Sequence, residues 1–437
     1  MNKKNKILIN ISIVSLLIFL NIYGKINEET ITNYLIDEQS SEHNKAENFY
    51  NNITNVKSLI YNLNLFINQT RQTNVIFADY FLSKVCYDKS AFTLFEYYLN
   101  ENIDIPYYIV NIKSEFYMSL LKQNKTKNLI LFNPENMSLF YKNLFYYLKD
   151  AKIIVNAYTI HFLQIIAGNV PYIKFLKINH GIKYFKVIYA KTEFNKALGK
   201  KKNAICSSPY EYELITKYLS PNQIHNASLV RYARFENIKK NESEKKCILA
   251  SFTYRTYNKY IFKNSIYKKN METLLNDDKL ISVLSNKNID LIYIPHHEEI
   301  DLGKKYFQSD YKYAKIKNQN SLEHYIEQCS LFITDFSSIS FDFMFQNKAV
   351  LFYSIDKNDS SNIIEKQFMR ESNDIIYFGN QFSNKDLLID KIIYYINNGF
   401  IIDYELRKKY ESVFFLKVNI IKRIVEIINN IVKSKIL

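Results

Sequence analysis

The chain has 437 residues, 47% of them hydrophobic, and a formal net charge of +15. Only seven glycines and six prolines are present, which excludes collagen-like or low-complexity sequence and predicts a globular protein long enough for two domains. Four scattered cysteines without a CxxC pair argue against structural zinc and a disulfide framework. The basic charge favours an anionic membrane surface or a polyanionic substrate as partner. Nucleic acid is not expected, because no zinc-finger, RNP-like or helix-turn-helix pattern is evident.

Residues 1–24 form a hydrophobic segment in which three lysines precede an apolar run from Ile7 to Tyr23. As a helix this run would be about 25 Å long at about 1.5 Å per residue, short of a typical hydrocarbon core. An uncleaved anchor, a signal peptide and a helix lying in the membrane interface are all open, and the positive-inside rule would place the rest of the chain outside the cytoplasm. Residues 25–73 are polar with scattered apolar periodicity and are predicted to be a helical lead-in.

Strands and helices alternate over residues 74–240, which predicts a first domain with a parallel, doubly wound sheet. A charged bridge over 239–246 separates it from a second alternation in residues 245–390. A helix is expected over 90–99. The expected strands of the two domains are 75–77, 107–110, 129–132, 153–155, 174–178, 247–252, 291–294, 331–334 and 349–353.

The later part of the chain adds helices to this pattern. One of them carries Leu322, Ile326 and Cys329 on one face, so Cys329 is expected to be a buried thiol. Residues 385–432 are predicted to form two terminal helices, most of which fall in a C-terminal segment, 391–437. The complete pattern predicts an α/β protein of GT-B-like architecture, with two Rossmann-like doubly wound domains and terminal helices.

A polar turn follows the apolar strand that ends near Ile333. It contains Thr334, Asp335, Ser337 and Ser338, and an amphipathic helix is expected directly after it, over 339–346. Hydroxyl groups and unpaired backbone N–H groups at the start of a helix suit a phosphate, because the helix dipole also favours an anion there. Taken alone, two serines at such a place are more simply helix caps.

Two of the seven histidines also follow apolar strands. His180 precedes Gly181, which allows the backbone to turn tightly and to approach a ligand, although a structural turn is the simpler interpretation of this pair alone. His296 precedes His297 and a glutamate. We do not expect a metal there, because adjacent histidines on an extended loop point apart and no third ligand has a suitable spacing.

In their order and spacing, these motifs resemble the CDP-glycerol glycerophosphotransferase family, the teichoic-acid and capsule polymerases of GT-B fold. The turn at 334–338 resembles the family's Thr-Asp-aromatic-Ser-Ser signature, His180-Gly181 its Trp-His-Gly-Thr-like motif and His296 its Pro-His-Pro element. The segments 229–234 and 248–255 resemble two further elements. The resemblance covers about residues 74–390. Asn179, Ala233 and His297 depart from it, because the family usually has an aromatic residue, Asp and Pro there.

The resemblance implies a role for each matching residue. His180 would be the general base, and His296 would stabilise the leaving nucleotide. Asp342 would order the serine turn or reach a substrate hydroxyl. Surface charge is the simpler interpretation of Arg231 and Arg255, and phosphate or interdomain contacts are equally open for Arg255. No cofactor and no metal are expected. The expected substrate-binding residues are Gly181, Lys183, Thr253, Arg255, Thr334, Asp335, Ser337, Ser338 and Asp342.

The implied reaction moves glycerol phosphate, or another polyol phosphate, from CDP-glycerol or a related CDP-polyol to a hydroxyl of a polyol-phosphate or glycan acceptor that is lipid-linked, and it releases CMP. Seven lysines between residues 183 and 202 would offer a surface for acceptor phosphates or lipid headgroups. Because such a donor is cytosolic, we expect membrane association with the active site on the cytoplasmic face. A GT-B glycosyltransferase, a CDP-ribitol transferase and a non-catalytic membrane-associated binding protein are the alternatives.

Overall fold

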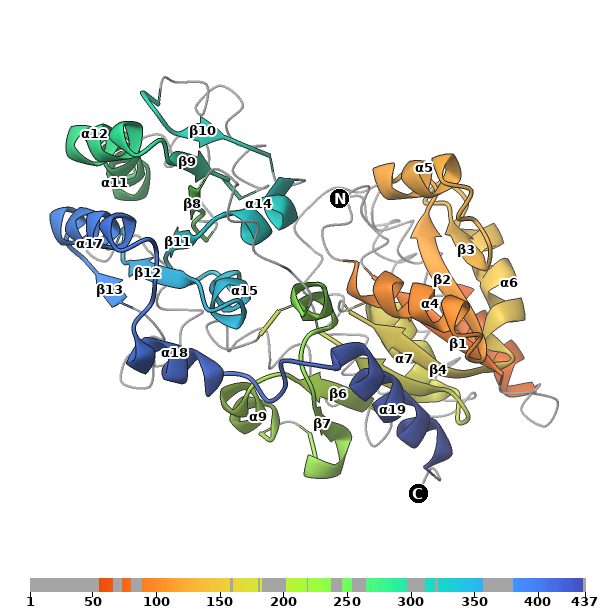
Figure 1. Cartoon of the computed structure of the whole chain (residues 1–437). Helices are drawn as coiled ribbons and strands as arrows, with labels where there is room; N and C mark the ends of the chain where they lie inside the picture. The colour runs from red at the N-terminus through yellow and green to blue at the C-terminus, as the bar shows by residue number, and fades with distance from the viewer. Residues whose placement is uncertain are drawn as a thin grey trace, which may run out of the picture.

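The computed structural model contains two parallel β-sheets that lie side by side, each flanked by helices (Figure 1). It describes residues 55–65, 73–79, 89–157, 160–179, 181–182, 202–217, 219–236, 246–253, 265–296, 311–318, 321–356 and 380–434. The expected segment 1–24 and most of the lead-in 25–73 lie outside these residues; within the lead-in, 55–65 is helical and Thr73 precedes β1. The α/β architecture of two doubly wound units is therefore confirmed.

The first sheet has the strand order β3-β2-β1-β4-β5-β6-β7, with every pairing parallel. β2 and β3 are added on one side of the central strand β1, and the chain then crosses to β4 on its other side. The strand order therefore reverses between β1 and β4. Its strands are β1 (Asn74–Ala78), β2 (Ile105–Asn111), β3 (Leu129–Phe132), β4 (Ala151–Asn156), β5 (Lys174–Lys177), β6 (Lys202–Cys206) and β7 (Ile224–Asn226). Its main helices are α4 (Ser90–Asn100), α5 (Glu115–Lys122), α6 (Met137–Leu148), α7 (His161–Asn169) and α9 (Pro209–Ile215).

The second sheet repeats this plan with the order β10-β9-β8-β11-β12-β13, again entirely parallel. Its strands are β8 (Cys247–Ala250), β9 (Asp290–Tyr293), β10 (Lys315–Ile316), β11 (Leu331–Thr334), β12 (Ala349–Tyr353) and β13 (Asn380–Phe382). Its helices are α11 (Ile266–Leu275), α12 (Asp278–Asn286), α14 (Leu322–Gln328), α15 (Ser340–Phe345) and α17 (Lys385–Asn397). All nine expected strands are present.

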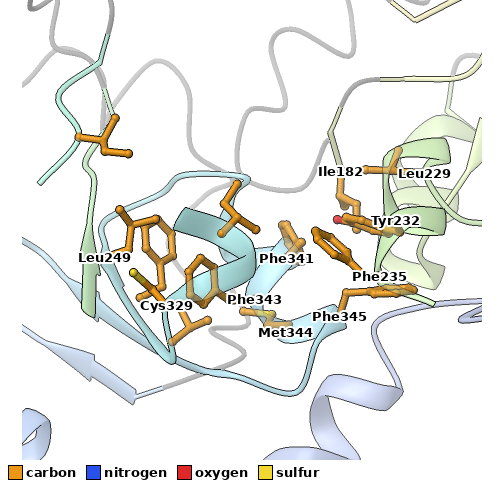
Figure 2. Close-up of a cluster of buried hydrophobic side chains, with 14 of the residues drawn as sticks. Ile182, Leu229, Tyr232, Phe235, Leu249, Cys329, Phe341, Phe343, Met344 and Phe345 are labelled. Carbon is orange, nitrogen blue, oxygen red and sulfur yellow. The ribbon is translucent and has the colours of Figure 1, made fainter. Parts of the chain in front are cut away.

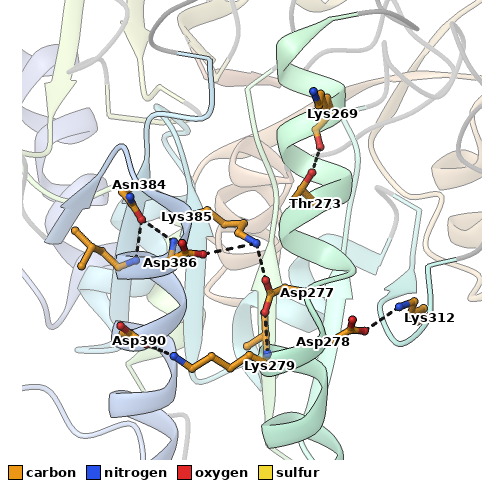
Figure 3. Close-up of polar contacts among 12 residues, drawn as sticks. Lys269, Thr273, Asp277, Asp278, Lys279, Lys312, Asn384, Lys385, Asp386 and Asp390 are labelled. Atoms are coloured by element: carbon orange, nitrogen blue, oxygen red, sulfur yellow. Dashed lines mark hydrogen bonds and ion pairs between the residues drawn. The ribbon is translucent and has the colours of Figure 1, made fainter.

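Polar contacts connect the helices α12 and α17 of the second sheet (Figure 3). Lys385 at the start of α17 donates to Asp277, which precedes α12, at 2.6 Å, and Lys279 donates to Asp390 at 2.5 Å. Burial raises the pKa of Asp277, but the hydrogen bonds from Lys385 and from the backbone of Leu280 outweigh it and lower that pKa overall.

The predicted number of terminal helices is wrong. Instead of two, the described C-terminal residues form three: α17, α18 (Tyr404–Glu411) and α19 (Ile420–Lys433). Residues Gly399 and Phe400 adopt positive φ angles of 64° and end the first, and Asp403 caps the second by accepting the N–H of Leu406 at 2.7 Å. The predicted boundary at 390/391 falls inside α17; the other domain limits stay predictions.

The helix α19 returns to the first sheet, as the dark blue ribbon in Figure 1 shows. The carboxylate of Glu236 accepts the N–H groups of Asn419 and Ile420, at 2.8 and 3.0 Å, at the start of α19. At its other end Lys174 of β5 donates to the carbonyl oxygens of Val432, at 3.1 Å, and of two neighbouring residues. Negative charge at the amino end and positive charge at the carboxyl end both complement the helix dipole, so α19 is anchored twice.

The expectation of a free thiol at Cys329 is wrong, because its sulfur is bonded to that of Cys247. These residues are 82 positions apart in sequence, but Cys247 begins β8 and Cys329 lies just before the adjacent strand β11. The N–H of Ser330 also donates to the carbonyl oxygen of Cys247 at 2.8 Å. Strand pairing brings the two sulfurs together, which the spacing of cysteines along the chain does not reveal.

Candidate active site

The two halves of the molecule meet through an aromatic contact between the 3-10 helix η4 (Val230–Phe235) and α15 (Figure 2). The Tyr232 ring stacks on Phe345 with centroids 4.5 Å apart, and Phe414 packs edge-on against both rings. Burial and the nearby Asp342 raise the pKa of Tyr232 well above its usual value, so its hydroxyl stays protonated. This contact fixes the position of the two sheets relative to each other.

At the carboxyl edge of the second sheet, Asp335 joins the turns that follow two neighbouring strands. Its Oδ1 accepts the backbone N–H of Thr253, after β8, at 2.8 Å and that of Phe336, after β11, at 2.7 Å. The carboxylate is 1% exposed. A buried carboxylate held by backbone N–H groups positions the two turns, and the structure thereby brings the predicted residues Thr253 and Asp335 together.

The serine turn continues from Asp335 directly into α15. Ser337 Oγ accepts the N–H of Ile339 at 3.3 Å, and Ser340 donates its hydroxyl to the carbonyl oxygen of Ser337 at 2.8 Å. Ser337 and Ser338 are half-buried, whereas Thr334 is fully buried and its hydroxyl oxygen has no hydrogen-bond partner among the residues that the structure describes. Of the four residues predicted to hold phosphates, the two serines therefore reach the surface and the other two lie beneath them.

The turn after β5 in the first sheet approaches this serine turn. Asn179 is fully buried with φ of 50°, and its Nδ2 donates to the carbonyl oxygen of Ile205 at 3.1 Å. Asparagine is among the few residues that adopt this left-handed conformation readily. A Cβ atom on Gly181 would lie 3.2 Å from Ser338 Oγ. The two motifs, one from each sheet, are thus in contact.

Three of the predicted site residues, His180, Lys183 and Arg255, lie outside the residues that the structure describes, as does His297. His296 is described: it is half-buried and follows β9, whose last residues are bonded to β8. The N–H of Ile294 donates to the carbonyl oxygen of Ala250 at 3.0 Å, so His296 belongs to the same carboxyl edge as Thr253. The lysine-rich stretch between 183 and 202 is described only at Lys202, which begins β6 and is buried.

Asp342 has a partner that sequence reasoning missed. Its Oδ2 lies 2.5 Å from an amino nitrogen of Arg231, which is on η4, and the Asp342 side chain is fully buried. The Arg231 side chain is only 17% exposed, so its interpretation as a surface charge is wrong. The resemblance of segment 229–234 to a family element pointed to Arg231, but it did not identify Asp342 as its partner.

A second aspartate was also missed, at the carboxyl edge of the first sheet. Asp79 follows β1 and is 1% exposed. Its Oδ1 accepts the N–H of Ala91 at 3.0 Å, and its Oδ2 accepts the N–H of Phe92 at 3.1 Å and the hydroxyl of Tyr108 at 3.1 Å. This carboxylate closes the start of α4, where Lys89 offers no side-chain cap.

Within the described ranges, no three His, Cys, Asp or Glu side chains gather in a way that would hold a metal ion. A search of those same ranges for a helix with the length and hydrophobicity of a membrane span finds none.

Comparison with known proteins connects this geometry to one group of enzymes. Residues 59–419 match the family described as CDP-Glycerol:Poly(glycerophosphate) glycerophosphotransferase. The chain is 24% identical over 346 residues to the minor teichoic acid biosynthesis protein GgaB of Bacillus subtilis (strain 168), covering 75% of this chain but 36% of GgaB. The chain thus spans about a third of the length of that curated relative.

Solved structures share the fold. The wall teichoic acid polymerase TagF superimposes with a TM-score of 0.59 at 14% identity, covering 91% of this chain and all of that one. A putative UDP-N-acetylglucosamine 2-epimerase from Listeria monocytogenes superimposes with a TM-score of 0.52 at 11% identity, covering 83% and 97% of the two chains. At these identities the likeness shows a common architecture.

Proposed function

Because the chain belongs to the CDP-glycerol:poly(glycerophosphate) glycerophosphotransferase family, we propose that it transfers glycerol phosphate from CDP-glycerol to a hydroxyl group of a surface-polymer acceptor, releasing CMP. The observation that supports this best is the contact between the turn at Gly181 and the turn at Ser338, which join the two sheets at their carboxyl edges. A transferase needs its two substrates held against each other, and ligands of doubly wound sheets bind at this edge.

The donor would bind at the second sheet. Ser337 and Ser338 offer hydroxyl groups at the surface of the turn, and Asp335 and Thr253 support that turn from below. His296 lies at the same edge and would carry positive charge toward the leaving phosphate. Phosphoryl transfer depends mainly on positioning and on charge stabilisation, and these residues would supply both.

The acceptor would bind at the first sheet, with His180 as the general base. Its imidazole would take the proton of the acceptor hydroxyl, whose oxygen forms a bond to the β-phosphorus of the donor. The bond from that phosphorus to the bridging oxygen breaks, and CMP leaves with the bonding electrons. A histidine with an ordinary pKa near 6.5 suits this proton transfer at neutral pH.

The acceptor's nature and location are further parts of the proposal. The names of GgaB and TagF place both relatives in teichoic acid production, which supports an acceptor of polyol-phosphate type. We propose that this acceptor is lipid-linked and that the protein works at the cytoplasmic face of an anionic membrane. The apolar run over 7–23 and the lysines between 183 and 202 support this location.

The test is CMP release by the purified full-length protein given CDP-glycerol, CDP-ribitol, CMP-sugars or UDP-sugars in turn, with a lipid-linked phosphoglycerol acceptor in anionic detergent–lipid micelles. Release from CDP-glycerol that His180→Ala abolishes is the expected result. His324→Ala, which removes an exposed histidine of α14, is the matched control and should stay active. Release from CDP-ribitol alone, or from a sugar nucleotide alone, would show that this compound and not CDP-glycerol is the donor. Folded protein that neither binds CMP nor releases it would overturn the proposal.

A further inference from the structure

The ion pair between Arg231 and Asp342 joins the two halves of the molecule directly behind the contact of their turns. Arg231 belongs to η4, which packs with the first sheet, and Asp342 belongs to α15 of the second. The two atoms are 2.5 Å apart, with the Asp342 side chain fully buried and that of Arg231 17% exposed. A charged pair in this setting is held in one geometry, because neither charge can separate without leaving the other uncompensated.

Asp342 and the serine turn form one hydrogen-bonded unit. The N–H of Asp342 donates to the carbonyl oxygen of Ile339 at 2.9 Å, and the N–H of Phe341 donates to that of Ser338 at 3.2 Å. The hydroxyl of Ser340 donates to the carbonyl oxygen of Ser337 at 2.8 Å. A displacement of Asp342 would therefore move Ser337 and Ser338 with it.

Arg231 is connected to the turn at Gly181 through hydrophobic packing and a cation-π contact. Ile182, the residue after Gly181, lies beside Leu229 and Tyr232 in the interface of Figure 2, and all three are buried in one hydrophobic cluster. The Arg231 guanidinium also lies over the Tyr232 ring, 5.6 Å from its centroid. The first-sheet side of the ion pair is thereby fixed to the backbone that follows His180.

We propose, on the basis of the proposed function, that Arg231 and Asp342 are positioning residues for the transfer step: their ion pair sets the distance between the turn at Gly181 and Ile182 and the turn at Ser337 and Ser338. Neither side chain touches the reacting atoms in this role. A misplacement of about 1 Å between two reacting groups can cost about 100-fold in rate, so the pair acts on the chemical step and not on donor affinity.

A second ion pair on the same 3-10 helix provides the matched control. Arg234 lies 2.8 Å from Glu323 and 3.3 Å from Glu327, both on α14, at the more exposed rim of the interface. Its partners are 43% and 35% exposed, so water screens this pair and its loss should be tolerated. Arg231→Gln and Arg234→Gln make the same chemical change at two depths of one interface.

The first experiment measures the distance between the two turns independently of catalytic activity. A Cβ at position 181 would lie 3.5 Å from the Cβ of Ser338, within the range of about 3.5–4.5 Å that a disulfide spans, so Gly181→Cys with Ser338→Cys should cross-link under mild oxidation. Linked peptides are quantified by mass spectrometry. We expect Arg231→Gln to slow cross-linking about tenfold, and Arg234→Gln to leave it within about threefold of the parent. Equal cross-linking rates in all three backgrounds would overturn the proposal, whether or not the protein is active.

The second experiment separates positioning from a purely structural role. Arg231→Gln should lower kcat for transfer about 10- to 100-fold while KM for CDP-glycerol changes less than about threefold. More of the CMP should appear with free glycerol phosphate, because water attacks the donor without needing the aligned acceptor half. A matching loss of donor affinity, or unchanged transfer, would contradict the proposal.

A folded double variant guards against instability. Arg231→Gln with Asp342→Asn leaves no unpaired buried charge and should keep the fold, while still losing transfer. Transfer restored to the parent level in this double variant would show that the charges only neutralise each other, and the positioning role would be wrong.

Discussion

Each sheet has an aspartate directly after an inner strand, and the two carboxylates have different structural roles. Asp79, after β1, uses both oxygens to accept the N–H groups at the start of α4 and a tyrosine hydroxyl. Asp335, after β11, accepts the N–H groups of two neighbouring turns through its Oδ1. The first carboxylate closes a helix start, whereas the second supports a turn whose two serines face outward.

This difference supports the proposal that the two edges bind different substrates. A helix start that already holds a carboxylate repels a phosphate. The first sheet therefore offers no anion site at α4, and the serine turn of the second is the better place for a diphosphate. This difference supports the proposed placement of the donor at the second sheet and of the acceptor at the first, and the following experiments test that placement.

The largest effect is expected from a charge at the serine turn. Ser338→Asp would place a carboxylate beside the proposed phosphates, and like charges in contact cost several kcal/mol, so CDP-glycerol affinity should fall about 100- to 1,000-fold. Calorimetric titration of the donor measures it. Ser338→Asn adds similar volume without charge and should lose about tenfold or less. An unchanged affinity in the aspartate variant would remove the donor from this turn.

The disulfide comes next, because it holds the amino ends of β8 and β11 while Asp335 holds the turns at their carboxyl ends. Replacing Cys247 and Cys329 together by serine should lower the free energy of unfolding by about 3 kcal/mol, since the cross-link restricts the unfolded chain. Urea unfolding with and without a reductant checks this. Reductant should shift the parent protein and leave the double variant unchanged; a parent that does not respond would contradict the prediction.

Asp79→Ala should destabilise the first sheet by about 2 kcal/mol, because two N–H groups at a helix start and a buried hydroxyl lose their acceptor. The midpoint of urea unfolding measures this loss. Donor affinity of the folded variant should stay within about twofold of the parent. Asp79→Asn retains one acceptor oxygen and should lose less stability. A donor affinity that falls together with stability would contradict the proposal that the donor binds at the second sheet.

Gly181→Ala tests the contact between the edges. Its Cβ would lie 3.2 Å from Ser338 Oγ, a close approach that a rotation of the serine side chain can relieve. We expect transfer to slow about fivefold, roughly 1 kcal/mol, with unchanged thermal stability. In a Ser338→Ala background, which lacks the crowded oxygen, Gly181→Ala should slow transfer by less than about fivefold; an equal cost in both backgrounds would show that the two residues act independently.

The smallest effect concerns pH and the edge of the first sheet. Burial, with a contribution from Arg423, lowers the pKa of His225. The unfolded chain therefore takes up this proton first as the pH falls below about 6.5, and stability is lost from there down to the lowered folded pKa, at no more than about 1.4 kcal/mol per pH unit. His225→Gln should flatten this part of the stability curve. Parallel curves for variant and parent would contradict it.

Sequence reasoning succeeded where one physical rule decides the structure. Parallel strands covered on both faces need continuous apolar residues, as in β11 and β12, and all nine such strands were found. The missed strands are β6, β7, β10 and β13, which are short or contain polar residues: β6 begins with Lys202 and Asn203, and β13 consists of Asn380, Gln381 and Phe382. These strands form because they pair with a neighbouring strand, and their own sequences have little hydrophobic pattern.

The site divides along the same line. Motif spacing correctly joined Thr253, Asp335 and the two serines, because each follows a strand of the same sheet. It did not find the partner of Asp342, since that depends on how two separate halves dock. The disulfide escaped for a related reason: strand order, which the spacing of cysteines does not encode, places β8 beside β11.

The double anchoring of α19 has a consequence for how the protein is made. Glu236 and Lys174 belong to the first half, yet the helix that they hold is translated only after the entire second sheet. Domains usually fold in order as they leave the ribosome, but here the earlier one keeps an uncovered apolar surface until Ile424, Ile428 and the other buried residues of α19 arrive. The first domain begins folding early and finishes late, so during synthesis it is exposed to chaperones and to premature association for the whole time that the second domain takes to emerge.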